Sequence, residues 1–341
     1  VLTNADATLT FNDLNAEFIS TNGLVNGKNF SIKGVCNLYG KFDFDVISKN
    51  QNLDYLYNAI QTSTMIDSIK KMLPQLDIIQ GLANLNLKVY GSIIDIEDIR
   101  FNENLFAKGQ LELLGNTFGM QGVKIEKTKG KIEFENNNAS ADINAYIGNS
   151  LLHAKAIVKN NIGDLVLSIP KFNLNDILPI ACDIKSDMGN ILLNVDAAYK
   201  GRIDEIEYNK IKFVAKILGT MPKNKLKLEN GIISLKNDKL KIENIKGSVL
   251  DTNSSFTINL NADNISTGHP HSNGLVQLKS FDLTSLNLIK QYSIIPDELK
   301  NITFEKGKIN LNCKIHNNKI NAYSDLGGIS FIYNPNELPI K

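Results

Sequence analysis

GKINLNCKI, the run from Gly307 to Ile315, is the third copy of a pattern that recurs along the chain. The earlier copies are GLANLNLKV from Gly81 and GNILLNVDA from Gly189, so the copies lie roughly 110–120 residues apart. Apolar and polar residues alternate after the glycine, which predicts a strand with one apolar and one wet face. A repeat of this length exceeds the common solenoid periods. We therefore expect each repeat to contain several strands.

A second motif precedes each copy: Asn or Asp, then Leu, with an aliphatic residue three positions later and a proline further on. It occurs at Asn52-Leu53, Asn173-Leu174 and Asp282-Leu283, ahead of Pro74, Pro179 and Pro296. In the first copy, apolar residues from Leu53 to Leu73 keep i, i+3, i+4 spacing. This spacing predicts an amphipathic helix with Asn52 as its N-cap. The other two copies predict shorter helices or loops in the same place.

Most of the remaining sequence alternates with period two in short runs that are separated by turn residues. The clearest runs are 132–134, 226–228, 240–242, 256–260 and 309–313. Such runs predict antiparallel strands. Asn230-Gly231 lies between two apolar runs and predicts a tight type I′ hairpin turn, because both central residues of that turn need positive φ.

The sequence thus predicts a mainly β fold, with a few short helices between units. No linker is visible, so we expect residues 1–341 to form one continuous segment. Its repeat units are placed at about 1–80, 81–188, 189–306 and 307–341, the last incomplete. Because the chain starts with Val and not Met, we expect it to be part of a longer protein.

Composition argues against several classes of partner. The formal net charge is +1, from 37 Lys and Arg against 36 Asp and Glu, so no strong field favours nucleic acid. Arginine, which makes most specific contacts to bases, occurs only at Arg100 and Arg202. No run of 18 or more apolar residues and no signal peptide is visible, so this stretch contains no predicted membrane-spanning helix.

Cysteine and histidine residues do not form a recognisable site. Cys36, Cys182 and Cys313 are odd in number and far apart, which fits neither a disulfide framework nor a zinc motif. Cys313 takes the place of aliphatic residues in the other copies, so we expect it to act as a small apolar residue. His269 and His271 are interpreted as part of a solvated loop, because a zinc site needs more ligands than these two.

Catalytic motifs are also missing. The acidic runs at 95–98 and 204–207 interleave with isoleucine and are interpreted as wet strand faces, not as an acid–base pair. The chain has no glycine-rich phosphate loop and no GxSxG motif. We therefore predict no enzyme activity, no metal site and no cofactor.

The apolar strand face is the remaining candidate for function. A sheet with one apolar face must bury that face against something. One solution is an ordinary sandwich with a dry core. The other is an elongated, strongly curved antiparallel sheet, whose apolar face forms a groove that a hydrocarbon ligand fills.

Two stretches resemble a known family. They are FDLTSLNLIKQYSIIPDELKNITFEKGKINLNCKIHNNKI, from Phe281 to Ile320, and GVKIEKTKGKIEFENNNASADINAYIGNSLLHAKAIV, from Gly122 to Val158. Both are similar to the repeating unit of AsmA-like proteins, which include the TamB and YhdP branches. In those proteins a strand ends in a DL..L motif, a proline-containing connection follows, and a glycine-led strand opens the next unit.

The resemblance implies a β-taco, or repeating β-groove, that carries phospholipid between the membranes of a Gram-negative bacterium. The chain would then be a periplasmic segment of an inner-membrane-anchored protein. Its partners would be phospholipid acyl chains, with the inner and outer membranes at the ends of the full-length protein. Alternatives are a TamB-like factor that assists an outer-membrane barrel protein, and a structural β-repeat such as an adhesin segment. By position, the implied groove-lining residues are Leu85, Leu87, Val89, Leu193, Val195, Leu311, Cys313 and Ile315.

Overall fold

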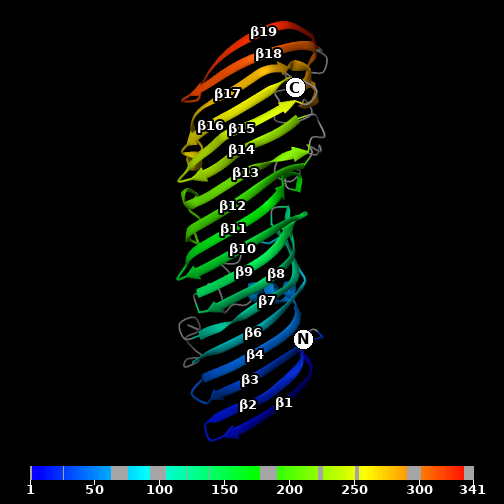
Figure 1. Cartoon of the computed structure of the whole chain (residues 1–341). Coiled ribbons are helices and arrows are strands. Elements are labelled where there is room, and N and C mark those ends of the chain that lie inside the picture. The colour runs from blue at the N-terminus through cyan, green and yellow to red at the C-terminus, as the bar shows by residue number, and fades with distance from the viewer. Residues whose placement is uncertain are drawn as a thin grey trace, which may run out of the picture. The chain divides into compact units, whose positions relative to one another are not determined.

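The chain is mainly β, as predicted. A computed structural model describes residues 2–25, 27–62, 76–92, 105–120, 122–136, 138–176, 190–221, 226–249, 253–289 and 301–333. Its 19 strands belong to one antiparallel sheet, and short helices separate some of them (Figure 1).

The strands are long, most of them 10 to 16 residues. They are β1 (Leu2–Asn12), β2 (Asn15–Val25), β3 (Lys28–Asn37), β4 (Lys41–Asn52), β5 (Ile78–Gln80), β6 (Leu82–Ser92), β7 (Leu105–Met120), β8 (Val123–Glu135), β9 (Asn138–Ile147), β10 (Ser150–Lys159), β11 (Ile162–Asn173), β12 (Asn190–Arg202), β13 (Ile211–Met221), β14 (Leu226–Lys236), β15 (Lys239–Val249), β16 (Ser255–Asp263), β17 (His271–Asp282), β18 (Ile302–His316) and β19 (Lys319–Tyr333). The helices are α1 (Leu53–Thr62), η1 (Leu174–Asp176), η2 (Tyr208–Lys210), η3 (Ile265–Thr267), η4 (Leu283–Ser285) and α4 (Leu286–Ile289), where η marks a 3-10 helix.

Two compact units divide the chain. Unit 1 comprises Val1–Gly148, Leu152–Leu167 and Lys200–Ile206, and unit 2 comprises Asn149–Leu151, Ser168–Tyr199 and Glu207–Lys341. Strands β1 to β9 thus lie wholly in unit 1 and β13 to β19 wholly in unit 2, whereas β10, β11 and β12 contribute residues to both.

Neighbours in sequence are neighbours in space within each unit. In unit 1, β1, β2, β3 and β4 pair in succession, β4 pairs with β6, and β6, β7, β8 and β9 continue the series. The short β5 pairs with β7 beyond the end of β6. In unit 2, β12 to β19 pair in chain order. Tight turns join several of these pairs, such as β1–β2 and β3–β4, since antiparallel strands need only a hairpin between them.

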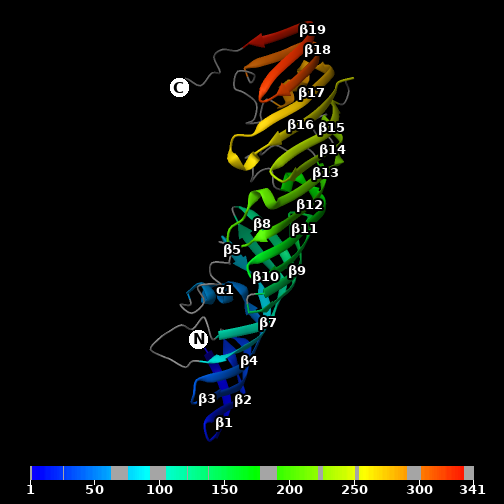
Figure 2. The same ribbon diagram turned by 90° about the vertical axis from the view of Figure 1, so that its left-hand side faces the viewer.

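Helix α1 packs against one end of the strands in unit 1. Its first residue, Leu53, is buried with Ala83 of β6 and Leu113 of β7 in a small core cluster. Figure 2 shows α1 on one side of the unit 1 strands. We call this end of the strands the helix margin and the opposite end the turn margin. In unit 2, η1, η4 and α4 follow the corresponding ends of β11 and β17.

Glycines on the apolar face let aromatic rings lie close to the neighbouring strand. A Cβ atom on Gly34 would lie 2.1 Å from the carbonyl oxygen of Asp43 and 2.7 Å from the ring of Phe44. A Cβ atom on Gly247 would lie 2.3 Å from the ring of Phe256. These rings cover the bare backbone of the glycine, which is a known way to pin strand register and curvature.

The helix that was predicted from Leu53 is confirmed as far as Thr62, and the rest of that prediction, up to Pro74, lies outside the described residues. Pro179, Pro296, Gly189 and Cys182 also lie outside them. The short helices that were predicted in the other copies are η1 and the η4–α4 pair.

The predicted hairpin at Asn230-Gly231 is wrong, because both residues lie inside the continuous strand β14. The register of β14 with β15 shifts on both sides of Asn230, and Gly231 has φ 155°. A β-bulge therefore occupies the site where the sequence predicted a turn. A β-bulge and a type I′ turn both favour glycine, because each requires a residue with positive φ.

Candidate functional site: the apolar sheet faces

One face of the unit 2 sheet carries an unbroken apolar row across eight strands. The strand register places one residue of each strand in this row, at about 4.8 Å from strand to strand. From β12 to β19 the row is Val195, Ala215, Ile233, Ile242, Leu260, Gly274, Ile315 and Ile320. The row runs across the strands, which is the direction in which a long hydrocarbon chain would contact all of them.

Unit 1 has a corresponding row across six strands. From β3 to β9 it consists of Ile32, Val46, Leu87, Gly109, Phe134 and Ala139. Residues one position away on the same strands are polar, with the exception of Ile47 on β4. Asp45, Lys88, Lys108 and Glu135 form such a row on the opposite face. Each unit therefore has one apolar and one polar face, as the period-two alternation predicts.

All eight residues implied as groove-lining lie on these apolar faces. Leu85, Leu87 and Val89 lie together on β6 in unit 1, where all three are half-buried. The other five lie in unit 2 on two strands, β12 and β18, that five further strands separate.

Exposure differs between these two strands of unit 2. Leu193 and Val195 on β12 are only 7% and 6% exposed. Leu311, Cys313 and Ile315 on β18 are half-buried, and Ile320, which pairs with Ile315 from β19, is 67% exposed. Apolar side chains along this row are therefore most exposed toward β18 and β19 within this unit.

No second sheet covers either apolar face in the described part of the chain, where all strands belong to one sheet. Many apolar side chains of the faces consequently keep part of their surface accessible.

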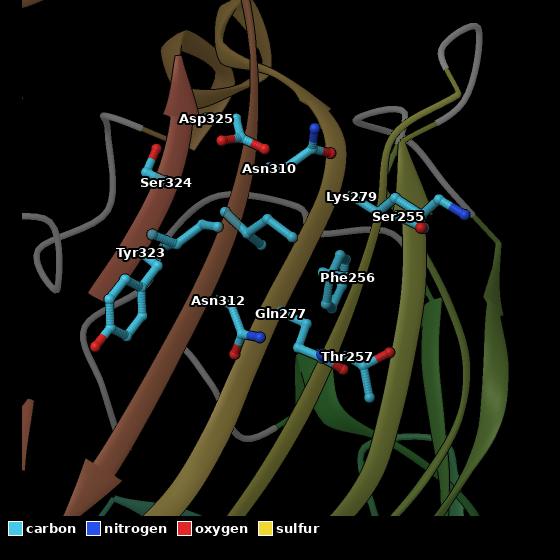
Figure 3. Close-up of a pocket in the computed structure, with 12 residues that line it drawn as sticks. Ser255, Phe256, Thr257, Gln277, Lys279, Asn310, Asn312, Tyr323, Ser324 and Asp325 are labelled. Atoms are coloured by element: carbon cyan, nitrogen blue, oxygen red, sulfur yellow. The ribbon is translucent and has the colours of Figure 1, made fainter. Parts of the chain in front are cut away.

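The polar faces carry two hollows. In unit 2, a cavity of about 450 Å³ lies over β16 to β19, and Thr257, Gln277, Asn312 and Tyr323 form one cross-strand row in its lining. Figure 3 shows Gln277 and Asn312 close together on neighbouring strands. In unit 1, a cavity of about 660 Å³ lies over β4 to β10 and is lined by amide groups and by charges of both signs. Both linings lack a nucleophile paired with a base.

Charges on the polar faces pair locally. The ammonium group of Lys88 lies 2.9 Å from a carboxylate oxygen of Asp43, and this hydrogen bond raises the pKa of Lys88 against the opposing effect of desolvation. Arg202 donates two hydrogen bonds, of 3.0 and 2.8 Å, to Asp204 and thereby lowers the pKa of that carboxyl group. Pairs at such exposed positions contribute little to stability.

The described residues contain no group of three or more His, Cys, Asp or Glu side chains that could hold a metal ion. His269 lies in the connection between η3 and β17, and His271 is the first residue of β17. Among the described helices, none is long and apolar enough to cross a bilayer.

Sequence reasoning missed several residues that the structure singles out. Ser150 and Ser254 are buried at the helix margin and hold the ends of β11 and β17. Leu38 and Tyr39 protrude from a turn. The period-two pattern gives no indication of either pair. For Leu38 and Tyr39, the only signal in the sequence is that this turn is apolar, whereas the turns elsewhere are rich in asparagine.

Comparison with protein-family models, with curated proteins and with solved structures finds no significant match. The class of protein is therefore defined by the fold alone: a single-layer antiparallel β protein with one apolar and one polar face in each unit.

Proposed function

We propose that the apolar faces bind the acyl chains of lipids, and that the chain works as a segment of an AsmA-like conduit for phospholipid between the membranes of a bacterial envelope. In this role it performs no chemistry. The lipid tails occupy the apolar face, and the headgroups remain in water. Anchoring in the inner membrane and contact with the outer membrane would belong to the full-length protein.

The single observation that carries this proposal is the cross-strand apolar row of each unit, together with the incomplete burial of its members. In a dry sandwich such a row would be packed against a second sheet about 10 Å away. Here one layer leaves the row partly accessible over several adjacent strands. A linear hydrocarbon matches this shape better than a compact ligand does.

The energetics favour such an occupant. Burying one methylene group contributes about 0.8 kcal/mol, so a sixteen-carbon chain gains on the order of 10 kcal/mol when it is fully buried. Because neighbouring strands offer equivalent apolar positions, a bound chain would have many states of similar free energy. Movement along the row would then occur in small steps, without an energy input at each one.

The test is mass spectrometry of lipids that co-purify with the protein from bacterial membranes. We expect phospholipid to co-purify with the wild-type chain and the amount to fall in Leu87→Asp, which places a charge in the unit 1 row. Asn86→Asp is the matched control, because it introduces the same carboxylate on the same strand but on the polar face.

A second pair, Val276→Asp and Gln277→Asp, repeats the comparison on β17 of unit 2. Circular dichroism establishes that each variant retains its strand content. The proposal is rejected if folded wild-type protein carries no lipid, or if the apolar-face and polar-face variants lose lipid equally.

A further inference from the structure

Two neighbouring turns at the turn margin of unit 1 expose large apolar side chains. Leu38 is 78% exposed and Tyr39 is 66% exposed in the turn between β3 and β4. Leu14, in the turn between β1 and β2, is 44% exposed. We call Leu14, Leu38 and Tyr39 the apolar tip.

Hydrogen bonds give the apolar tip a defined conformation. The amide of Leu38 donates to the carbonyl oxygen of Leu14 at 2.9 Å, which joins the two turns directly. Within the second turn, the side-chain oxygen of Asn37 accepts from the amides of Tyr39 and Lys41 at 3.0 and 2.9 Å. The side chains of the tip are therefore exposed from an ordered backbone.

The turns themselves do not require apolar residues. Asp13 and Gly40, with φ of 47° and 74°, already supply the left-handed backbone that tight turns need. Four other hairpin turns in the described part of the chain have asparagine or aspartate at their positive-φ positions, namely at Asn136, 160–161, 237–238 and 317–318. The apolar side chains at 14, 38 and 39 thus have no structural role in forming the turns, and each keeps much of its surface in water.

We propose that the apolar tip inserts into the interfacial region of a phospholipid bilayer. Leucine and tyrosine suit this position, because the interface favours aliphatic groups and amphipathic aromatic rings. The tip exposes on the order of 400 Å², well below the roughly 800 Å² that each partner contributes to a stable protein–protein interface. Protruding turns can enter a fluid bilayer without a complementary surface.

Charge does not contribute to this interaction. Among the described residues that form or directly flank the two turns in sequence, Asp13 and Lys41 are the only charged ones, and their charges cancel. Hydrophobic burial therefore holds the tip, and binding should occur on zwitterionic vesicles and change little with salt. The inference does not depend on acyl chains binding the apolar faces, because the tip lies on the turns and not on the strand rows.

The absence of tryptophan from the chain makes a direct test possible. In Tyr39→Trp the introduced indole is the sole fluorophore of its kind. On phosphatidylcholine vesicles its emission should shift to the blue and be quenched by brominated acyl chains. Tyr323→Trp is the matched control: Tyr323 is 73% exposed but lies on the polar face of β19, so its emission should not change.

A second measurement uses sedimentation with the same vesicles. Leu14→Asn combined with Leu38→Asn replaces two tip residues by the residue that the other turns use, and should lower the partition coefficient about tenfold. Leu218→Asn combined with Ile332→Asn removes two aliphatic side chains that are each 52% exposed on strands, and should leave the coefficient unchanged.

Three results would overturn the inference. The first is that the indole of folded Tyr39→Trp protein is neither shifted nor quenched on vesicles. The second is an equal loss of partitioning in both double variants. The third is a blue shift of the same indole that rises with protein concentration in the absence of vesicles, which would assign the tip to a contact between two copies of the chain.

Discussion

Two buried serines stabilise the points where long strands pass into the short helices. The hydroxyl group of Ser254 donates to the carbonyl oxygen of Ser280 at 3.0 Å and accepts from the amide of Asp282 at 2.8 Å. Ser150 has the same role one repeat earlier, where its oxygen accepts from the amide of Asn173 at 3.0 Å. Both amides belong to the Asn/Asp-Leu motif. In these two copies the motif therefore marks the end of a strand that is hydrogen-bonded to a serine next to the start of another strand.

Removal of this hydroxyl group should be costly for stability. Ser254→Ala leaves a backbone amide and a backbone carbonyl group without their partner at a buried site, which should lower the free energy of unfolding by about 1–3 kcal/mol. Urea denaturation followed by circular dichroism measures the loss. Ser255→Ala removes an equivalent hydroxyl from a half-buried position and should change stability by less than about 0.5 kcal/mol. Equal effects of the two substitutions would contradict this assignment.

At the scale of the element, a residue with positive φ recurs at the same place in each repeat, and in the first and third copies the strand register also shifts there, as in a β-bulge. Asn50, Lys171 and Ser280 each lie three residues before the leucine of the Asn/Asp-Leu motif, and each has positive φ, between 46° and 56°. In two copies an asparagine of the next paired strand binds the bulge. Asn310 accepts from the amide of Ser280 at 2.7 Å, and Asn84 accepts from the amide of Asn50 at 3.0 Å.

The two asparagines of β18 should therefore respond differently to substitution. Asn310→Ala removes the acceptor for the Ser280 amide and should destabilise the protein by about 1 kcal/mol. Asn312→Ala should cost nothing or stabilise slightly, because the side-chain oxygen of Asn312 is buried without a hydrogen-bond partner. Thermal unfolding of the two variants side by side checks the difference, and a larger loss in Asn312→Ala would show that the bulge contact is unimportant.

The elements also show how far the sequence could be interpreted. Period-two alternation assigned residues such as Leu87 and Asn86 to opposite faces, because side-chain direction in a strand depends only on position. The repeat pattern drew attention to the Leu-Asn pair that all three copies share, which includes Asn86 and Asn312. The hydrogen bonds to the bulges are instead made by the asparagines two positions before these, Asn84 and Asn310. Asn230-Gly231 was assigned to a hairpin, since a local signal for positive φ does not distinguish a turn from a bulge. That choice depends on the partner strand.

At the scale of the whole molecule, the mainly β fold was predictable because the same alternation recurs along the entire chain. The division into two compact units was not, since no linker or change in composition marks the boundary, and three strands contribute residues to both units. The apolar tip was also missed. A leucine in a turn has no periodic signal, and its exposure can be recognised only when the neighbouring turn is placed beside it.

The open apolar faces have a consequence for the stability of the whole molecule. A ligand that binds only the folded state adds RT ln(1 + [L]/Kd) to the free energy of unfolding, or about 2.7 kcal/mol at a hundredfold excess over Kd. For units of this size, that corresponds to a rise in melting temperature of about 5–10 °C.

The melting temperature of delipidated protein should therefore rise when a long-chain fatty acid is added below its critical micelle concentration. A short-chain acid should have little effect, because it buries few methylene groups. The Leu87→Asp variant should lose part of the shift and Asn86→Asp should keep it. Identical melting curves with both acids would mean that the apolar rows do not take up hydrocarbon.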